Sequence, residues 1–164
     1  MREITLKHTE LSDISTEVLE RGGLFCFRAH GSSMYPFFRD GDVLTIQPVE
    51  IETLAIGDVV FYRSAWDKVI AHRVVAKKFS NGKCVLTTRG DSGLNTNEQV
   101  QADHVLGRVM SIQRGEKVIR LDNTFRKLTS RLWIISYPLS ALFLRAVLRI
   151  KRKSSFLLQL LASK

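Results

Sequence analysis

Short runs of Val, Ile, Thr and aromatic residues recur between residues 24 and 121, and turn-forming residues separate them. Runs of this length and composition are typical of β-strands. Asn81-Gly82 and Gly115 lie between such runs, where hairpin turns are expected. We therefore predict a mainly β fold, a compact coiled β structure with one helix before it and one or two helices after it. The predicted strands are Leu24–Ala29, Val43–Val49, Asp58–Arg63, Lys68–Lys78, Cys84–Thr88, Val105–Gln113 and Lys117–Leu121.

The first 23 residues predict an amphipathic helix. Gly22-Gly23 follows its apolar positions as a stop signal. The stretch is otherwise polar and has no long apolar run of the kind that directs export. We therefore expect the folded domain to stay in the cytoplasm. The apolar residues that share one face of the predicted helix are Leu11, Ile14, Val18 and Leu19.

The positive charge is concentrated in the last third of the chain. Residues 114–164 contain 12 Lys or Arg and 2 Asp or Glu, a net charge of +10, whereas residues 1–113 have a net charge of −1. The near-neutral first part argues against nucleic-acid binding. The apolar run Leu132–Leu144 has 13 residues and contains Pro138, and a bilayer-spanning helix needs about 20 apolar residues.

Five basic residues follow this run within 145–153. We predict that the tail forms amphipathic helices that lie on an anionic membrane surface, on its cytoplasmic face. The alternative is a basic helix packed against the protein itself or a partner subunit, in a cytoplasmic protein.

Ser33 and His72 are candidates for a nucleophile and its base. Gly31 permits a sharp turn just before the serine, and Pro36 fixes φ just after it. A serine hydroxyl is a poor nucleophile near neutral pH unless a base takes its proton. Histidine is the side chain whose ordinary pKa suits that task. The alternative for His72 is a partly buried strand histidine without a chemical role.

Several short boxes follow one another along residues 24–112. They are Gly31-Ser32-Ser33-Met34-Tyr35-Pro36, Gly41-Asp42-Val43-Leu44, Gly57-Asp58-Val59-Val60-Phe61-Tyr62, Ile70-Ala71-His72-Arg73-Val74-Val75, Leu86-Thr87-Thr88-Arg89-Gly90-Asp91 and Val105-Leu106-Gly107-Arg108-Val109. In this order the boxes resemble the signal peptidase superfamily of serine proteases, which also includes the self-cleaving LexA-type repressors. The resemblance implies the coiled β-sheet fold of that superfamily, with Ser33 as the nucleophile and His72 as the general base.

The residue at the base position separates the branches of the superfamily. Bacterial signal peptidases and LexA-type proteins have lysine there, whereas the endoplasmic-reticulum, archaeal and sporulation-type signal peptidases have histidine. His72 therefore resembles the Ser-His branch. Lys78 would share the face of His72 on a regular strand, but about 20 Å along it, which is too far to replace the base.

The third catalytic position departs from the pattern of the Ser-His branch. There an aspartate lies six residues after the late Gly-Asp pair, and this chain has Asn97. Asparagine can orient an imidazole but carries no charge to stabilise the imidazolium, and the same change in trypsin costs about 10⁴ in kcat. Three interpretations are open: a slow dyad, a carboxylate supplied by Asp91 or Asp103, or a module that binds without cleaving. Asp91 has a simpler alternative role, capping the turn that opens the following loop.

For the oxyanion hole, the resemblance implies the backbone N–H of Ser33 as a donor. Ser32 is a second candidate, although turn formation also accounts for it. Neither a cofactor nor a metal is expected, because the sequence contains no phosphate-binding loop and no second pair of Cys or His at ligand spacing. Cys26 and Cys84 are predicted to be reduced residues of the core.

These features predict a membrane-associated serine endopeptidase of the Ser-His type. Its parts would be an N-terminal helix in 1–23, a catalytic domain in 24–122 and a basic tail in 123–164. The resemblance implies cleavage of an extended peptide or protein after a small residue, with small residues also favoured at the third position before the cut. The substrate would add a strand beside the active-site strands. The alternative is a catalytically weak or inactive peptide-binding, regulatory module on the same fold; a self-cleaving regulator without the lysine base is a third.

Overall fold

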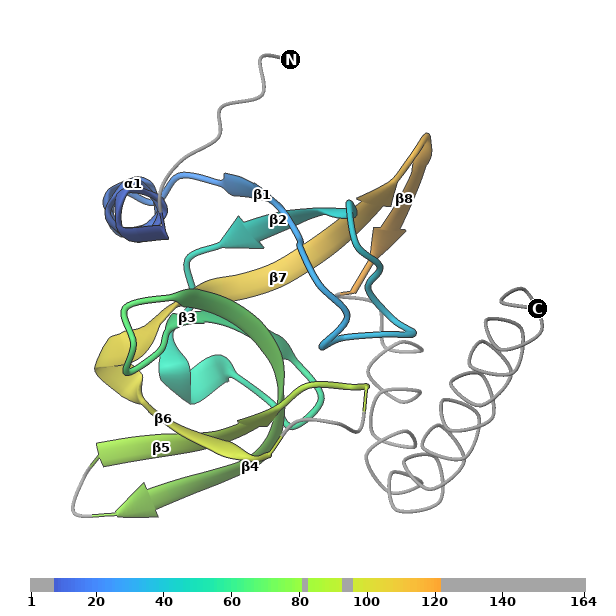
Figure 1. Ribbon diagram of the computed structural model, residues 1–164. Coiled ribbons are helices and arrows are strands. Elements are labelled where there is room, and N and C mark those ends of the chain that lie inside the picture. The colour runs from blue at the N-terminus through green and yellow to red at the C-terminus, as the bar shows by residue number, and fades with distance from the viewer. Residues whose placement is uncertain (1–7, 81–82, 93–95, 122–164) are drawn as a thin grey trace, which may run out of the picture.

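The computed structural model describes residues 8–80, 83–92 and 96–121 (Figure 1). One helix, α1, precedes the strands, and every strand pair is antiparallel. The predicted mainly β fold with an N-terminal helix is therefore confirmed, while the helices predicted within 123–164 lie outside the described residues. The elements are α1 (His8–Glu20), β1 (Phe25–Arg28), β2 (Val43–Gln47), η1 (Ile51–Thr53), β3 (Val59–Arg63), β4 (Val69–Ser80), β5 (Lys83–Arg89), β6 (Glu98–Gln101), η2 (Ala102–His104), β7 (Val105–Arg114) and β8 (Lys117–Arg120).

The strands form a single curled sheet in the order β1-β2-β7-β3-β4-β5-β6, and β8 pairs with β7. The strand register shifts between Thr45 and Ile46, between Phe61 and Tyr62, and between Val74 and Ala76. Such irregularities bend a strand and increase its twist. The sheet consequently curls into a half-barrel, with β3 and β4 in its middle (Figure 1).

One strand, β6, was not predicted. Its sequence, Glu98–Gln101, contains a single apolar residue, Val100, which is buried. The strand lies at the edge of the sheet, where it pairs with β5 alone among the described strands. A short, polar edge strand has too few apolar positions to show the alternation by which strands are predicted. No strand was predicted between Cys84–Thr88 and Val105–Gln113, so β6 was missed.

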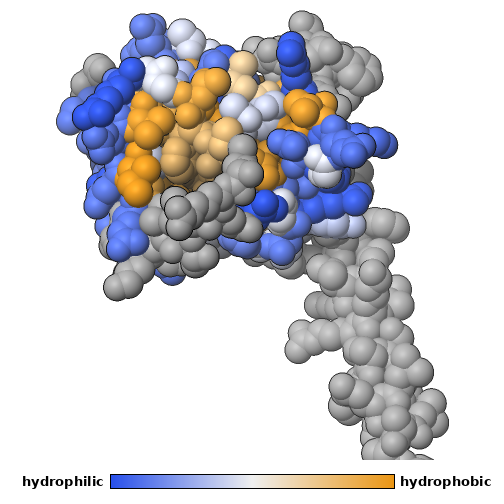
Figure 2. Space-filling model, turned by 90° about the horizontal axis from the view of Figure 1, so that it is seen from above, coloured by the Kyte–Doolittle hydropathy of each residue, from blue (hydrophilic) through white to orange (hydrophobic). Residues whose placement is uncertain are grey.

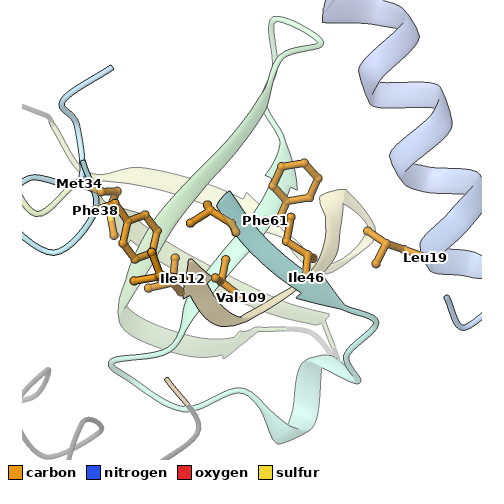
Figure 3. Close-up of a cluster of buried hydrophobic side chains, with 9 residues drawn as sticks. Leu19, Met34, Phe38, Ile46, Phe61, Val109 and Ile112 are labelled. Atoms are coloured by element: carbon orange, nitrogen blue, oxygen red, sulfur yellow. The ribbon is translucent and has the colours of Figure 1, made fainter. Parts of the chain in front are cut away.

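Two apolar clusters cover the two faces of β3. Phe61 and Val59 point into one cluster, and Val60 and Tyr62 belong to the other. Figure 3 shows the first cluster: Leu19 of α1 lies at one end, Met34 and Phe38 from the loop after β1 lie at the other, and Ile46 of β2, Phe61 and residues of β7 lie between them. The loop that carries Ser33 is thus fastened to the core of the domain.

The buried face of α1 differs from the predicted one. Leu19 is buried, but Ile14 is exposed, and the small side chains of Ser12 and Ser15 are buried instead. Small residues allow close approach of the helix to the strands on which it packs, β7, β1 and β4. The predicted end of the helix is confirmed, since the N–H groups of Gly22 and Gly23 close the last turn.

The cysteine prediction is half right. Cys84 is buried in the second cluster, whereas Cys26 is exposed because β1 alternates between the core and solvent. Both thiols are free.

Within the described ranges, no group of His, Cys, Asp or Glu side chains has the arrangement of a metal site. The same ranges include no helix of the length and apolar character needed to cross a membrane.

Candidate active site

Ser33 lies in a tight turn that is closed at its base by backbone hydrogen bonds. Gly31 has φ +91°, in the region that favours glycine, as the turn prediction required. Its N–H donates to Oδ1 of Asp40 at 2.7 Å. Below it, Ala29 N–H donates to the Asp42 carbonyl at 2.8 Å, and Gly41 N–H donates to the Ala29 carbonyl at 2.9 Å. These bonds hold residues 29–42 as a fixed loop that contains Ser33.

The aspartates of the Gly-Asp boxes stabilise this scaffold. The buried Asp42 carboxylate accepts two hydrogen bonds from Arg114, at 2.9 and 2.7 Å, and one from the Arg39 N–H at 2.8 Å. The hydrogen bonds from Arg114 are the main reason that the pKa of Asp42 is lowered. Arg114 also donates to the carbonyl of Phe37 at 3.0 Å, so this ion pair connects the loop that contains Ser33 to the end of β7. Asp58 stabilises a different turn, the one before β3, because its carboxylate accepts a hydrogen bond from the Ala55 N–H at 3.0 Å.

Asp91 belongs to a buried ion pair with Arg73. Its two oxygens accept from Nε and Nη2 of Arg73 at 2.8 and 2.6 Å. Arg73 also donates to the Gly57 carbonyl at 2.8 Å, and its guanidinium lies 4.8 Å from the centre of the Phe37 ring. This pair fixes the turn at residues 91–92 against β4 and against the loop that carries Ser33.

The turn at 91–92 lies next to both candidate catalytic residues. Ser92 N–H donates to the Ser33 carbonyl at 2.9 Å. The Asp91 charge is close enough to His72 to raise its pKa. In the described ranges no hydrogen bond joins Ser33 Oγ to the imidazole, and in free enzymes such bonds often form fully only with substrate. The Ser33 N–H likewise donates to no described residue.

His72 is a buried residue of β4, opposite Val60 of β3. Only 8% of it is exposed. Burial lowers the pKa of His72 below its ordinary value, and the negative charges of Glu98 and Asp91 oppose that shift in part. The imidazole is therefore largely neutral at pH 7, the state in which it can accept a proton.

The Nδ1 atom of His72 contacts a network of hydrogen-bonded side chains that come from three other strands. It lies 3.3 Å from the Tyr62 hydroxyl of β3, and this hydroxyl donates to Oε2 of Glu98 in β6 at 2.6 Å. Thr88 of β5 donates to the Tyr62 oxygen at 3.2 Å. Burial, followed by the Glu98 hydrogen bond, raises the pKa of Tyr62 well above its ordinary value. The tyrosine therefore stays neutral at any pH at which the protein would work.

The other predicted residues are placed as follows. Asn97 is exposed just before β6, and no hydrogen bond links it to His72 in the described ranges. Asp103 is exposed in η2, and Ser32 is exposed beside Ser33. Lys77, which was not a predicted site residue, has a structural role: it donates to the carbonyls of Ile51, Glu52 and Leu54 at 2.8–3.1 Å around η1.

Tyr62 and Glu98 were not predicted as site residues. Tyr62 lies in the Gly57–Tyr62 box, where its apolar neighbours favour an ordinary core role. Glu98 is adjacent to Asn97, one residue beyond the position at which the superfamily has its aspartate. A search for carboxylates on either side of that position would have included it, but only strand pairing shows which side chain faces His72.

The comparisons with known proteins do not assign the chain to a family. Neither the scan against protein-family models nor the search of curated proteins gave a match. The resemblance to the signal peptidase superfamily therefore depends on the sequence boxes alone, and the function that it implies is a proposal.

Proposed function

We propose that the protein is a serine endopeptidase similar to the Ser-His signal peptidases, with Ser33 as nucleophile and His72 as general base. One observation carries the proposal: a turn-presented serine and a buried histidine with a lowered pKa both border the turn at residues 91–92. Perturbed titratable groups beside a nucleophile are typical of active sites.

The proposed reaction begins when the neutral imidazole of His72 takes the proton of Ser33 Oγ. The oxygen attacks the peptide carbonyl, and the negative charge develops towards the Ser33 N–H. His72 then returns the proton to the leaving amine, and an acyl group remains on Ser33. Water, activated by the same imidazole, releases the acyl group. No metal or cofactor enters this sequence of steps.

An extended peptide would bind along β1. This strand pairs with β2 alone among the described strands and so lies at an edge of the sheet, the place at which an extended peptide adds a strand. The chain runs directly from this strand into the Ser33 loop. Figure 2 shows an apolar patch framed by hydrophilic residues on the face seen from above, the side of Figure 1 on which β1 and β2 lie. Small side chains before the cut would suit close approach of the substrate to this edge.

The pKa of His72 predicts how activity depends on pH. Only the neutral imidazole can act as the base, and its pKa is lowered from about 6.5. We therefore expect kcat/KM for a quenched peptide with small residues at the first and third positions before the cut to rise with pH, with a midpoint below 6.5, and to level off at higher pH. A midpoint at or above pH 7 would contradict the assignment of His72 as a buried base.

We also propose that the basic tail attaches the enzyme to anionic membranes. Each Lys or Arg near such a surface contributes about 1 kcal/mol, so the full chain should sediment with phosphatidylserine vesicles at low salt and less so at high salt. Replacing Arg145, Arg149, Lys151, Arg152 and Lys153 with glutamine provides the matched control and should greatly reduce binding. If the unaltered chain stays in the supernatant at low salt, the tail is a packing or partner-binding segment.

The second candidate function is a peptide-binding module without catalysis. It is favoured by the neutral, exposed Asn97 at the position of the superfamily aspartate. The two candidates differ in one measurable respect, since only an enzyme forms a covalent bond between Ser33 and an acylating probe.

A further inference from the structure

The polar contacts of His72 allow its tautomer to be derived. A tyrosine hydroxyl has one proton to donate, and an ionised carboxylate only accepts. The 2.6 Å contact with Glu98 therefore uses the Tyr62 proton. The remaining contact of Tyr62, at 3.3 Å from Nδ1 of His72, can be a hydrogen bond only if Nδ1 carries the proton. The neutral ring is then protonated on Nδ1, and the lone pair lies on Nε2.

We propose that Tyr62 and Glu98 are positioning residues that together replace the missing aspartate, by fixing the Nδ1–H tautomer and orientation of His72. The inference rests on the proposed function, because it assigns these residues a role in the reaction of Ser33. Two successive hydrogen bonds, from Nδ1–H to Tyr62 Oη and from Tyr62 Oη–H to Glu98 Oε2, connect the imidazole to the carboxylate. Through them the negative charge of Glu98 stabilises the proton on Nδ1. Proton transfer from Ser33 then occurs at Nε2, and the imidazolium that forms is stabilised without losing its Nδ1 proton.

The surroundings of the chain support this role. Tyr62 is fully buried, and the Thr88 hydroxyl donates to its oxygen, so that the hydroxyl has little freedom to rotate away from Glu98. The titratable groups that face His72 are Tyr62 from β3, Glu98 from β6 and Asp91 from the turn after β5. Asp91 is bonded to Arg73 through both oxygens. Glu98 is therefore the carboxylate that is linked to the imidazole by hydrogen bonds.

The first test reads the tautomer directly and does not depend on activity. In the full-length protein, long-range ¹⁵N–¹H NMR spectra of the imidazoles, assigned with a His72→Gln variant, should show His72 protonated on Nδ1 at pH 8. In the Glu98→Gln variant, the amide group of Gln can donate a hydrogen bond to the Tyr62 oxygen. The Tyr62 hydroxyl then donates its own proton to Nδ1 of His72. We expect the ring in that variant to be protonated on Nε2. Protonation on Nε2 in the unaltered protein would overturn the proposal even if the enzyme is active.

The second test measures the rate of peptide hydrolysis and its dependence on pH. Glu98→Gln should lower kcat/KM for the quenched peptide by about 10²- to 10³-fold, less than the 10⁴ observed when a directly bonded aspartate is neutralised. The midpoint of the acid limb should also move to lower pH, because the Glu98 charge raises the pKa of His72. Glu116→Gln, an exposed glutamate between β7 and β8, is the matched control and should change neither quantity.

Tyr62→Phe should have the same effect on rate with the hydroxyl alone removed. If the Tyr62→Phe variant does not fold, the tautomer and the pH dependence of the Glu98→Gln variant provide the test. The proposal is wrong if Glu98→Gln leaves the tautomer and the acid limb unchanged, or if Asn97→Asp raises kcat/KM while Glu98→Gln does not lower it. An inactive unaltered protein with the Nδ1–H tautomer would contradict the proposed function but leave the positioning of His72 intact.

Discussion

Ser33→Ala is expected to reduce peptide hydrolysis by about 10⁴-fold or more, because the attacking oxygen is removed. The change removes a hydroxyl that is bonded to no other described residue, so the free energy of unfolding should stay within about 0.5 kcal/mol of the original value. His72→Gln should reduce hydrolysis to a similar extent, since the serine then has no base. The two losses should not add in the double variant, because the residues act as a unit.

The measurement is the rate of cleavage of the quenched peptide, with circular dichroism and urea unfolding to verify the fold. Ser111→Ala, a change of the same type on β7, is the matched control and should keep full activity. Full activity in either Ser33→Ala or His72→Gln would show that these residues do not carry the reaction.

Asp91→Asn is expected to cost about 3–5 kcal/mol of unfolding free energy. The Arg73 and Asp91 side chains are each only 4% exposed. Removing the carboxylate charge leaves a guanidinium buried with a weaker partner, which is the costly way to break a buried ion pair. In urea, the midpoint of unfolding should fall with little change in the m-value. Activity should fall as well, since the same pair fixes the turn that bonds to Ser33.

The exposed pair of Arg21 and Glu17 in and after α1 supplies the control. Its side chains are 78% and 61% exposed, and Glu17→Gln should cost less than about 1 kcal/mol. Replacing both Arg73 and Asp91 with apolar residues should cost less than Asp91→Asn alone, because no buried charge remains. Equal costs for Asp91→Asn and Glu17→Gln would mean that the buried pair does not stabilise the fold as described.

Much of the sheet could be predicted because its apolar residues are local signals. Strands such as β3 and β4 are rich in Val, Ile and aromatic residues, and their neighbours supply turn residues. The edge strand β6 lacked that signal, since only Val100 among its four residues is apolar. On α1 the apolar face was misplaced because Ser12 and Ser15, not Ile14, fit against the sheet. Helix packing depends on the partner surface, which the helix sequence does not contain.

Those residues of the candidate site that lie in local sequence motifs could be predicted, whereas those brought together by strand pairing could not. Ser33 and His72 stood out because each lies in a short motif whose chemistry is local. The contacts among His72, Tyr62 and Glu98 depend on long-range pairing of β3, β4, β5 and β6, which places residues 36 positions apart within hydrogen-bonding distance. Spacing from the superfamily pattern led to Asn97, whose side chain is exposed, whereas the neighbouring Glu98 contacts Tyr62. Glu98 is the first residue of β6 and Asn97 precedes the strand, so a one-residue difference decides which side chain is held on the sheet beside Tyr62.

Acylation of Ser33 by a fluorophosphonate distinguishes a serine endopeptidase from a module that only binds peptides. The full-length protein is incubated with the probe at pH 8, and its intact mass and proteolytic peptides are measured by mass spectrometry. One adduct per chain is expected on Ser33; it should form far more slowly in His72→Gln and be absent in Ser33→Ala. A protein that remains unlabelled, or is labelled at another serine with Ser33 intact, would contradict the assignment of Ser33 and His72 as nucleophile and base.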